Sequence, residues 1–310
     1  MKCLHIGQGF IGNKVIDKLA DSGRYDEIDV FDLEFGKDLR NRQQVFEAIK
    51  GYDKVILMAA IANLNDFEAD PLLGMDVNVG GLINVANSCM VLKKKLYFIS
   101  TCCVYGNTKE LPSSEKAHVA PSEIYAAAKY AGEWIIKGYQ KSYDLDYVIL
   151  RLATCYGPGM RAALAPAVFI NQIKRGEPIT IHGSGEQTRT LTYIDDLVDG
   201  IVTVINSDVM NETFNISTEE ERSVNELVEI IKQEMGVPDW KVRHTPDRKG
   251  QTFKEQIDAK KVRDIRIWRG RYAPTAKKAD EVVGWKAKTT LRQGIRKTLR
   301  WMKKEKMEQI

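Results

Sequence analysis

The chain has 310 residues, of which 44% are hydrophobic and 28% charged, and its formal net charge is +4. This composition is typical of a globular protein with a large core. The mild basic excess, much of it in the last third, is not interleaved with aromatic residues, so we expect no nucleic-acid partner. No apolar stretch has the length that spans a bilayer and the N-terminus leads directly into a predicted strand, so we expect neither a membrane partner nor a signal peptide.

The five cysteines, Cys3, Cys89, Cys102, Cys103 and Cys155, form an irregular set. They include no CxxC pair and no histidine at a ligand spacing, so we expect no metal site. Reduced thiols in the cytoplasm are the simplest interpretation.

Strands and helices alternate through the first half of the chain. We predict strands at 2–6, 28–31, 54–58, 96–100 and 146–150, and helices at 13–22, 45–49, 75–92 and 124–143. This alternation is typical of βαβ units with helices on both faces of a sheet. It predicts an α/β fold with a Rossmann-type, doubly wound parallel sheet.

A glycine-rich motif follows the first predicted strand. Gly7, Gly9 and Gly12 form GxGxxG between this strand and the next helix. Such glycines allow a tight turn and a close approach of the backbone to a pyrophosphate, which the helix N-terminus faces. Asp32, 20 residues beyond Gly12, would accept hydrogen bonds from adenosine ribose hydroxyls and repel a 2′-phosphate. The motif predicts NAD rather than NADP; the alternative is a loop aspartate that caps a turn.

Tyr125 and Lys129 open the helix at 124–143 and share one of its faces. An ammonium beside a phenol stabilises the phenolate, which makes a general base near neutral pH. The alternative is a solvated lysine beside a packed tyrosine. Thr101 follows the fourth predicted strand, at the edge where parallel sheets bind ligands.

From about residue 156 the alternation loosens, and Pro and Gly punctuate loops between later helices at 224–235 and 291–304. We therefore expect an NAD-binding domain over 1–160. A smaller, mixed α/β C-terminal domain over 161–310 would mainly bind substrate, with the chain crossing back into the first domain.

Taken together, the motifs resemble those of the extended short-chain dehydrogenase/reductases, in particular the NAD-dependent epimerase/dehydratase family of nucleotide-sugar enzymes. The resemblance covers nearly the whole chain. It rests on GxGxxG, Asp32, Asp38-Leu39, Ala59-Ala60, Asn78, Ser100-Thr101-x-x-Val104-Tyr105-Gly106, Tyr125-x-x-x-Lys129, Arg151 leading to Tyr156-Gly157-Pro158-Gly159, Gly183-x-Gly185-x-Gln187-x-Arg189 and Tyr193-Ile194-Asp195-Asp196.

The resemblance implies a cofactor site, catalytic roles and substrate contacts. The implied NAD-binding residues are Gly7, Gly9, Phe10, Ile11, Gly12, Asp32, Asp38, Leu39, Ala59, Ala60, Asn78, Tyr125 and Lys129. Tyr125 would take the proton from a sugar hydroxyl, in most relatives at C4, while NAD takes the hydride; Lys129 would hold the nicotinamide ribose, and Thr101 would bond the same hydroxyl. Thr154, at the position of a usual Asn, would contact substrate, and Arg189 and Arg248 would bind the diphosphate of a nucleotide sugar. Either arginine would otherwise be a surface residue.

Cys102 and Cys103 distinguish this chain from several relatives. The 4,6-dehydratases carry Asp-Glu directly after the threonine. A 3,5-epimerase carries a cysteine at the position of Cys103, and a 5,6-dehydratase carries one close to this position. A thiol near NAD and Lys129 would be partly thiolate and able to act as acid or base. The alternative is that both cysteines are small packing residues. Leu164 stands where a 3,5-epimerase has a lysine, so double epimerisation is disfavoured.

We therefore expect a nucleotide-sugar 4-epimerase, with a dehydratase that uses Cys102 or Cys103 as the alternative. A net oxidoreductase and a non-catalytic NAD-binding sensor or scaffold are further possibilities; the latter would not need Thr101, Tyr125 and Lys129. The resemblance also implies carbohydrate biosynthesis and a homodimer joined through the helices at 75–92 and 124–143. A basic insertion near 262–274 would be either a lid over the substrate phosphates or a solvated surface segment.

Overall fold

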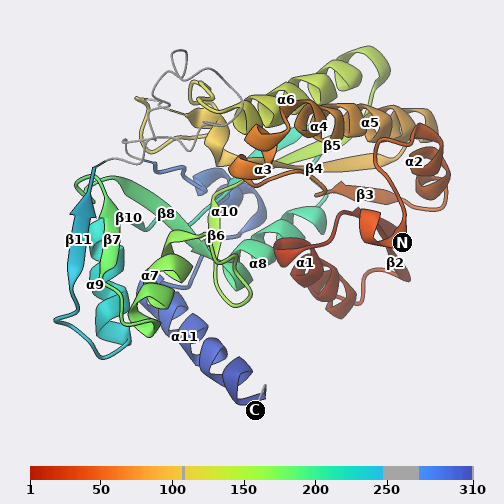
Figure 1. Cartoon of the computed structure of the whole chain (residues 1–310). Helices are drawn as coiled ribbons and strands as arrows, with labels where there is room; N and C mark the ends of the chain where they lie inside the picture. The colour runs from red at the N-terminus through yellow and green to blue at the C-terminus, as the bar shows by residue number, and fades with distance from the viewer. Residues whose placement is uncertain (107–108, 247–271, 309–310) are drawn as a thin grey trace.

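The computed structural model describes residues 1–106, 109–246 and 272–308. Its centre is a six-stranded sheet in the order β2-β1-β3-β4-β5-β9, with every neighbouring pair parallel (Figure 1). The strands are β1 (Lys2–Ile6), β2 (Glu27–Phe31), β3 (Lys54–Leu57), β4 (Lys95–Thr101), β5 (Tyr147–Leu152) and β9 (Glu212–Ile216). This confirms the expected α/β fold with a Rossmann-type parallel sheet.

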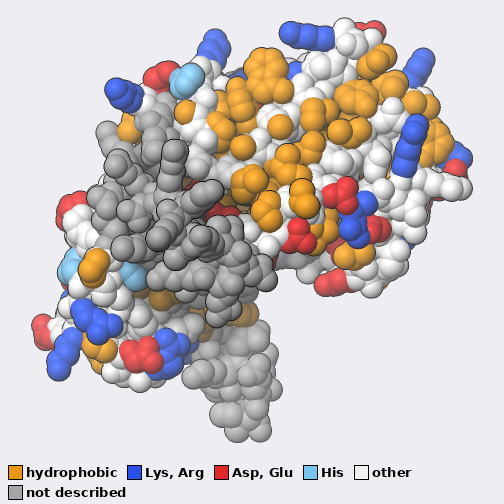
Figure 2. Space-filling model, turned by 45° about the horizontal axis from the view of Figure 1, so that its top comes forward, with side chains coloured by type: hydrophobic (Ala, Val, Ile, Leu, Met, Phe, Trp, Pro, Cys, Tyr) orange, Lys and Arg blue, Asp and Glu red, His pale blue; other side chains and the backbone are white. Residues whose placement is uncertain are grey.

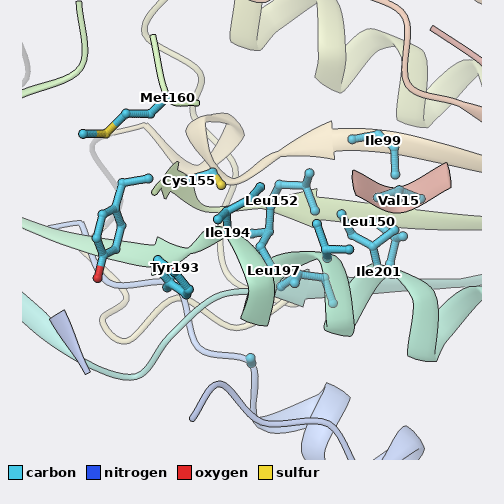
Figure 3. Close-up of a cluster of buried hydrophobic side chains, with 14 of the residues drawn as sticks. Val15, Ile99, Leu150, Leu152, Cys155, Met160, Tyr193, Ile194, Leu197 and Ile201 are labelled. Carbon is cyan, nitrogen blue, oxygen red and sulfur yellow. The ribbon is translucent and has the colours of Figure 1, made fainter. Parts of the chain in front are cut away.

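Helices cover both faces of this sheet. On one face lie α1 (Phe10–Asp21) and α8 (Ile194–Ile205), and on the other α2 (Arg42–Ile49), α5 (Gly81–Leu92) and α6 (Ile124–Tyr143) (Figure 1). Successive residues of β4 alternate between the two cores. Leu96 and Phe98 pack toward α5 and α6, whereas Tyr97 and Ile99 join the cluster that Val15 and Ile201 build on the α1 and α8 side (Figure 3). Burial on both faces explains why these strands are nearly continuous apolar runs.

The second half of the chain adds two small sheets and four helices to the described structure. Strands β6 (Thr154–Tyr156), β8 (Thr188–Tyr193) and β10 (Glu221–Ser223) form one sheet, and β7 (Ile179–His182) pairs with β11 (Val242–Thr245). The helices are α7 (Ala165–Lys174), α9 (Val224–Glu234), α10 (Lys277–Val283) and α11 (Leu291–Glu308). Since β9 pairs with β5, the chain returns to the central sheet before β10 begins.

The predicted helix at 75–92 is present, but it begins earlier and is π-helical over its first part. After α3 (Leu64–Ala69), α4 (Pro71–Met75) continues through a π-helical turn, η2 (Asp76–Gly80), into α5. The buried Asn78 side chain in this turn accepts a hydrogen bond from the Ile61 backbone N–H (2.8 Å) and donates to its carbonyl (3.1 Å). A tertiary contact of this kind cannot be read from a local apolar pattern, and π-turns recur where a side chain has such a special task.

Two short 3₁₀ turns, η1 (Leu33–Phe35) and η3 (Cys102–Tyr105), follow the carboxyl ends of β2 and β4. All five cysteines are free thiols. No helix among the described residues is long and apolar enough to cross a membrane.

Candidate active site

The loop between β1 and α1 leaves room for a bound anion. Gly7 has φ 93°, and a Cβ there would lie 2.4 Å from the Ala59 Cα, so only glycine fits against the start of the Ala59-Ala60 segment. Gly9 has φ 141°, and a Cβ there would meet no atom within 4 Å. Residues 10–12 form the first turn of α1, whose backbone N–H groups lack partners within the helix. Open space before a helix N-terminus fits the pyrophosphate of a dinucleotide.

Asp32 lies at the carboxyl end of β2, beside this loop. Its carboxylate accepts hydrogen bonds from the backbone N–H groups of Gln8 (2.8 Å) and Glu34 (3.0 Å). These two bonds orient the carboxylate next to the glycine-rich turn and leave further lone pairs for ribose hydroxyls. The alternative of a turn-capping aspartate is also visible, since Asp32 caps η1. The two tasks are compatible.

Asp38, Leu39 and Asn78 were also expected around the cofactor. Asp38 forms an ion pair with Arg40 (2.6 Å), and Leu39 is buried against Gly81 at the start of α5. Asn78 bonds the Ile61 backbone rather than pointing into open space. In this structure Asn78 therefore supports the loop that follows Ala59-Ala60, which bears on the shape of the cofactor site.

Thr101 and Tyr125 meet at the carboxyl end of β4. Thr101 is the last residue of the strand, and its hydroxyl accepts a hydrogen bond from the Cys103 N–H (3.1 Å) and lies close enough to the Tyr125 side chain to lower its pKa. The Tyr125 ring packs edge-on against Phe67, with 6.2 Å between the ring centres. Burial raises the pKa of Tyr125 above its usual value and nearby Cys103 raises it further, whereas Arg161 and Thr101 lower it.

Lys129 lies one helical turn beyond Tyr125 and is 3% exposed. Its ammonium donates to the Ile99 carbonyl (2.9 Å) and lies 4.8 Å from the centre of the Phe98 ring. Burial lowers the pKa of Lys129 to about 7, and the opposing effect of Glu133 is smaller. A cation held with so little compensation favours a ligand that offers it hydrogen-bond acceptors.

The two adjacent cysteines have different surroundings. Cys102 is fully buried, and its thiol donates to the Arg151 carbonyl (3.2 Å). Cys103 is partly exposed, and its backbone N–H donates to the Thr101 hydroxyl (3.1 Å). Burial raises the pKa of both thiols, which disfavours thiolate. Of the pair, Cys103 is the one whose charge would act on Tyr125.

Of the three residues expected to contact substrate, the structure describes Arg189 and Thr154. Arg189, on β8, donates to the Thr188 carbonyl (2.7 Å); burial lowers its pKa, and Tyr272, Cys103 and Glu123 act in the opposite direction. Thr154 begins β6 and is partly exposed. Arg248 and most of the basic insertion lie outside the described residues.

Glu123 and Arg161 near Tyr125 were missed by the sequence reasoning. Glu123 is the N-cap residue of α6, but its side chain makes no capping hydrogen bond. Burial raises the pKa of Glu123, and Glu68 raises it further while Arg189 lowers it. Arg161 follows the Gly157-Pro158-Gly159 turn and lowers the pKa of Tyr125. Glu123 was visible in the sequence as a carboxylate two residues before Tyr125; Arg161 carried no comparable signal.

A paired polar network lies beneath these groups. Arg151 on β5 and Glu133 on α6 are buried and form a two-pronged ion pair, with contacts of 2.7 and 3.0 Å. Arg151 also donates to the Tyr105 hydroxyl (2.9 Å), which donates to Asn215 on β9 (2.7 Å). Burial opposes the charge of Arg151, but the bonds to Glu133 outweigh it and raise its pKa. The network ties β5, α6, η3 and β9 together under Thr101.

Comparisons with known proteins agree with this geometry. The family model described as the NAD dependent epimerase/dehydratase family matches residues 7–217. A putative UDP-glucose 4-epimerase of Methanocaldococcus jannaschii is 31% identical over 96% of both chains, and human dTDP-D-glucose 4,6-dehydratase is 29% identical over 73% of this chain and 61% of its own. The crystal structure of Thermotoga maritima UDP-glucose 4-epimerase with UDP-glucose superposes with a TM-score of 0.84, at 27% identity and covering 98% and 99% of the two chains.

The glycine-rich turn, the aspartate after β2 and the open space before α1 fit the cofactor that the family description names, so NAD is the cofactor, as expected from the sequence. The expected resemblance is also confirmed, because the matched segment spans both the cofactor loop and the Thr101, Tyr125 and Lys129 group. This chain belongs to the NAD-dependent epimerase/dehydratase family.

Proposed function

We propose that this protein is a nucleotide-sugar 4-epimerase that oxidises the sugar at C4 to a transient ketone and re-reduces it on the other face. The observation that carries the proposal is the position of Thr101 and Tyr125 at the carboxyl end of β4, on the edge of the sheet that carries the glycine-rich loop. Lys129 follows one helical turn beyond Tyr125 and bonds the Ile99 carbonyl of the same strand. A non-catalytic NAD-binding protein has no need of this trio.

Tyr125 is proposed as the group that takes the proton from the C4 hydroxyl and returns it. Thr101 would hold the same hydroxyl, since its side chain is close enough to Tyr125 to lower the pKa of the phenol. NAD, held by the 7–12 loop and Asp32, supplies the hydride acceptor when bound. Lys129 would bond the nicotinamide ribose and lower the pKa of Tyr125, which burial otherwise keeps high. Arg189 would bind the substrate diphosphate, with Thr154 and Arg248 as further substrate contacts.

Dehydration is the second candidate, and the position of Cys103 favours it. Its thiol borders Thr101 and Tyr125, and the carboxyl of Glu123 is close enough to raise its pKa. These groups could move a proton at a carbon beside the ketone. The fully buried Cys102, bonded to the Arg151 carbonyl, suits a packing role better than acid or base chemistry.

The test is mass spectrometry of UDP-, dTDP- and GDP-sugars after incubation in D2O, without added NAD. Unchanged mass with a new retention time supports the 4-epimerase, whereas loss of one water assigns a dehydratase. Gain of deuterium without loss of water would mean epimerisation beside the ketone. Turnover that starts only when NAD is added, and that consumes it, would mean a net oxidoreductase. The Tyr125→Phe variant should retain NAD and lose turnover; full activity of this variant would refute the assignment.

Paired cysteine variants separate the two main candidates. Replacing Cys102 and Cys103 by Ala should spare a 4-epimerase and abolish dehydration. Cys89→Ala is the matched control, because Cys89 is also fully buried but lies on α5. Loss of activity in both variants would indicate a packing defect instead, which thermal denaturation would reveal.

We also propose two domains with different ligands, and a homodimer. Residues 1–160 would form the NAD-binding domain and 161–310 the main part of the substrate domain, in the reducing cytoplasm that suits five free thiols. Figure 2 shows apolar side chains gathered over α4, α5 and α6. The exposed ones are Leu72, Leu73, Met75, Ile83, Val91, Ile124, Trp134 and Tyr143.

A contiguous apolar surface of this kind marks an interface. Sedimentation velocity should show a dimer that Trp134→Glu dissociates, while Val282→Glu, at an exposed apolar residue on α10, leaves it intact. A monomeric wild type would refute the dimer.

A further inference from the structure

We infer that α11 and the segment before it form a surface that attaches the protein to a membrane carrying anionic phospholipid headgroups. The inference starts from an uneven distribution of charge. Residues 285–304 contain eight Lys and Arg and no Asp or Glu, whereas the whole chain has a net charge of +4, so the other 290 residues carry −4. The eight cations, called the basic face below, are Lys286, Lys288, Arg292, Arg296, Lys297, Arg300, Lys303 and Lys304.

Six of these cations lie on α11, whereas Lys286 and Lys288 precede it. The helix packs through Leu291, Ile295 and Thr298, which are buried, whereas all eight cations are exposed. Arg292, Arg296 and Arg300 recur every four residues and therefore form one row. Figure 1 shows α11 running from the second half of the molecule to the C-terminus at its edge. A basic row on a peripheral helix can approach a flat surface without hindrance from the rest of the fold.

Two acidic side chains contact the first half of the basic face. Glu234 pairs with Arg292 (3.0 Å) and Arg296 (2.8 Å), and Asp196 accepts hydrogen bonds from the backbone of residues 288 and 289. Within the described ranges, Lys288, Arg300 and Lys303 make no ion pair. A hollow of about 360 Å³ opens between Lys288, Thr289, Gln293, Arg296, Lys297 and Arg300, with no acidic side chain in its lining. Phosphate groups would supply the missing negative charge.

The extent of the basic face favours a bilayer over a single small anion. From residue 291 to 304 the helix rises by roughly 20 Å, more than one phosphate-bearing ligand spans. Trp301 and Met302 lie among the cations and are partly exposed. Tryptophan and basic residues together on one amphipathic helix are typical of the membrane interface. Nucleic acid is the other extended polyanion, but it is commonly held on several stacking aromatics, and Trp301 is the single aromatic of this segment after Trp285, which is buried.

From the sequence we expected no membrane partner, because no apolar stretch is long enough to span a bilayer. Electrostatic attachment to the surface of a bilayer needs no such stretch. The overall charge of +4 also conceals the difference between the basic face and the acidic remainder.

The test is co-sedimentation of the full-length protein with vesicles of phosphatidylcholine alone and with 30 mol% phosphatidylglycerol. We expect binding to the anionic vesicles only, and its loss when salt is raised from 0.1 to 0.5 M, because the Debye length then shortens from about 10 Å to roughly 4 Å. The triple variant Lys288→Glu, Arg300→Glu, Lys303→Glu should bind at least ten-fold more weakly, since each basic residue near an anionic bilayer contributes about a factor of five.

The matched control is Lys50→Glu, Lys141→Glu, Lys241→Glu, which changes the net charge equally at exposed lysines elsewhere. It should bind nearly as the wild type does, and both variants should keep wild-type turnover. Equal binding to both kinds of vesicle, or equal losses in the two triple variants, would overturn the inference. Absence of vesicle binding together with salt-sensitive binding of a labelled RNA duplex would overturn it in favour of nucleic acid.

Discussion

Lys129 and Arg151 are both buried cations within reach of the same carboxylate, yet their surroundings differ. Arg151 forms a two-pronged ion pair with Glu133, and its pKa is raised. Lys129 is one helical turn from Glu133 but donates to the Ile99 carbonyl, and burial lowers its pKa to about 7. A paired charge holds elements together, whereas a charge left without an acidic partner is available to a ligand. The paired Arg151 therefore supports the site, whereas Lys129 is available to act in it.

Removing the paired cation should have the largest effect on folding. Arg151→Met leaves Glu133 buried without its cation, so we expect the free energy of unfolding to fall by about 3–5 kcal/mol. Urea denaturation measures this change. Arg222→Met is the control, because the exposed Arg222 pairs with the exposed Glu226 and the partly exposed Glu220; this substitution should cost under ~1 kcal/mol. Similar losses in the two variants would contradict the assigned difference.

Removing the unpaired cation should affect turnover rather than stability. Lys129→Met leaves no buried partner charge uncompensated, so stability should be unchanged or higher, while kcat falls by about 10²–10⁴-fold if Lys129 tunes Tyr125. Steady-state kinetics and thermal denaturation test the two halves of this prediction. Lys137→Met, two turns farther along α6, is the matched control. Wild-type kcat in Lys129→Met would remove Lys129 from the proposed machinery.

Lys129 should also give stability a characteristic pH dependence in cofactor-free protein. Its folded pKa of about 7 lies below the ordinary value of 10.5, so between these values the unfolded state binds more protons. Stability then rises with pH by at most about 1.4 kcal/mol per unit from pH 7 upward, and the full cost of burying the charge applies below pH 7. The advantage of Lys129→Met over wild type should therefore shrink from pH 7 to 9. If the stability difference between Lys129→Met and wild type stayed constant with pH, Lys129 would be either neutral throughout or charged and well compensated by its surroundings.

The smallest expected effect concerns Glu123. Its charge raises the pKa of both Tyr125 and Cys103, so Glu123→Gln should lower the pKa of Tyr125. The acidic limb of the pH profile of kcat/KM should move to lower pH by roughly a few tenths of a unit. Glu47→Gln, at an exposed position on α2, should leave the profile unchanged. A shift to higher pH would contradict the placement of Glu123 beside Tyr125.

Local sequence patterns were sufficient to predict those helices, strands and turns whose conformation depends on residues close in the chain. The helix at 124–143 and the strand that ends beside Thr101 were predicted to within a residue or so, because apolar periodicity reports which face is buried. The cofactor loop was predicted from glycine spacing for a similar reason: Gly7 requires a backbone conformation and a close approach that other residues do not tolerate.

Long-range packing decided the rest. The sequence presents Cys102 and Cys103 as equals, but the turn after β4 buries one against the Arg151 carbonyl and leaves the other beside Thr101. Asn78 bonds Ile61 from a π-helical turn, and Glu133 pairs with Arg151 rather than with Lys129. The sequence by itself determined the family, the cofactor motif and the Tyr125 and Lys129 pair. Only the tertiary structure decided which buried charges are paired, because that depends on which segments, distant in sequence, share a low-dielectric interior.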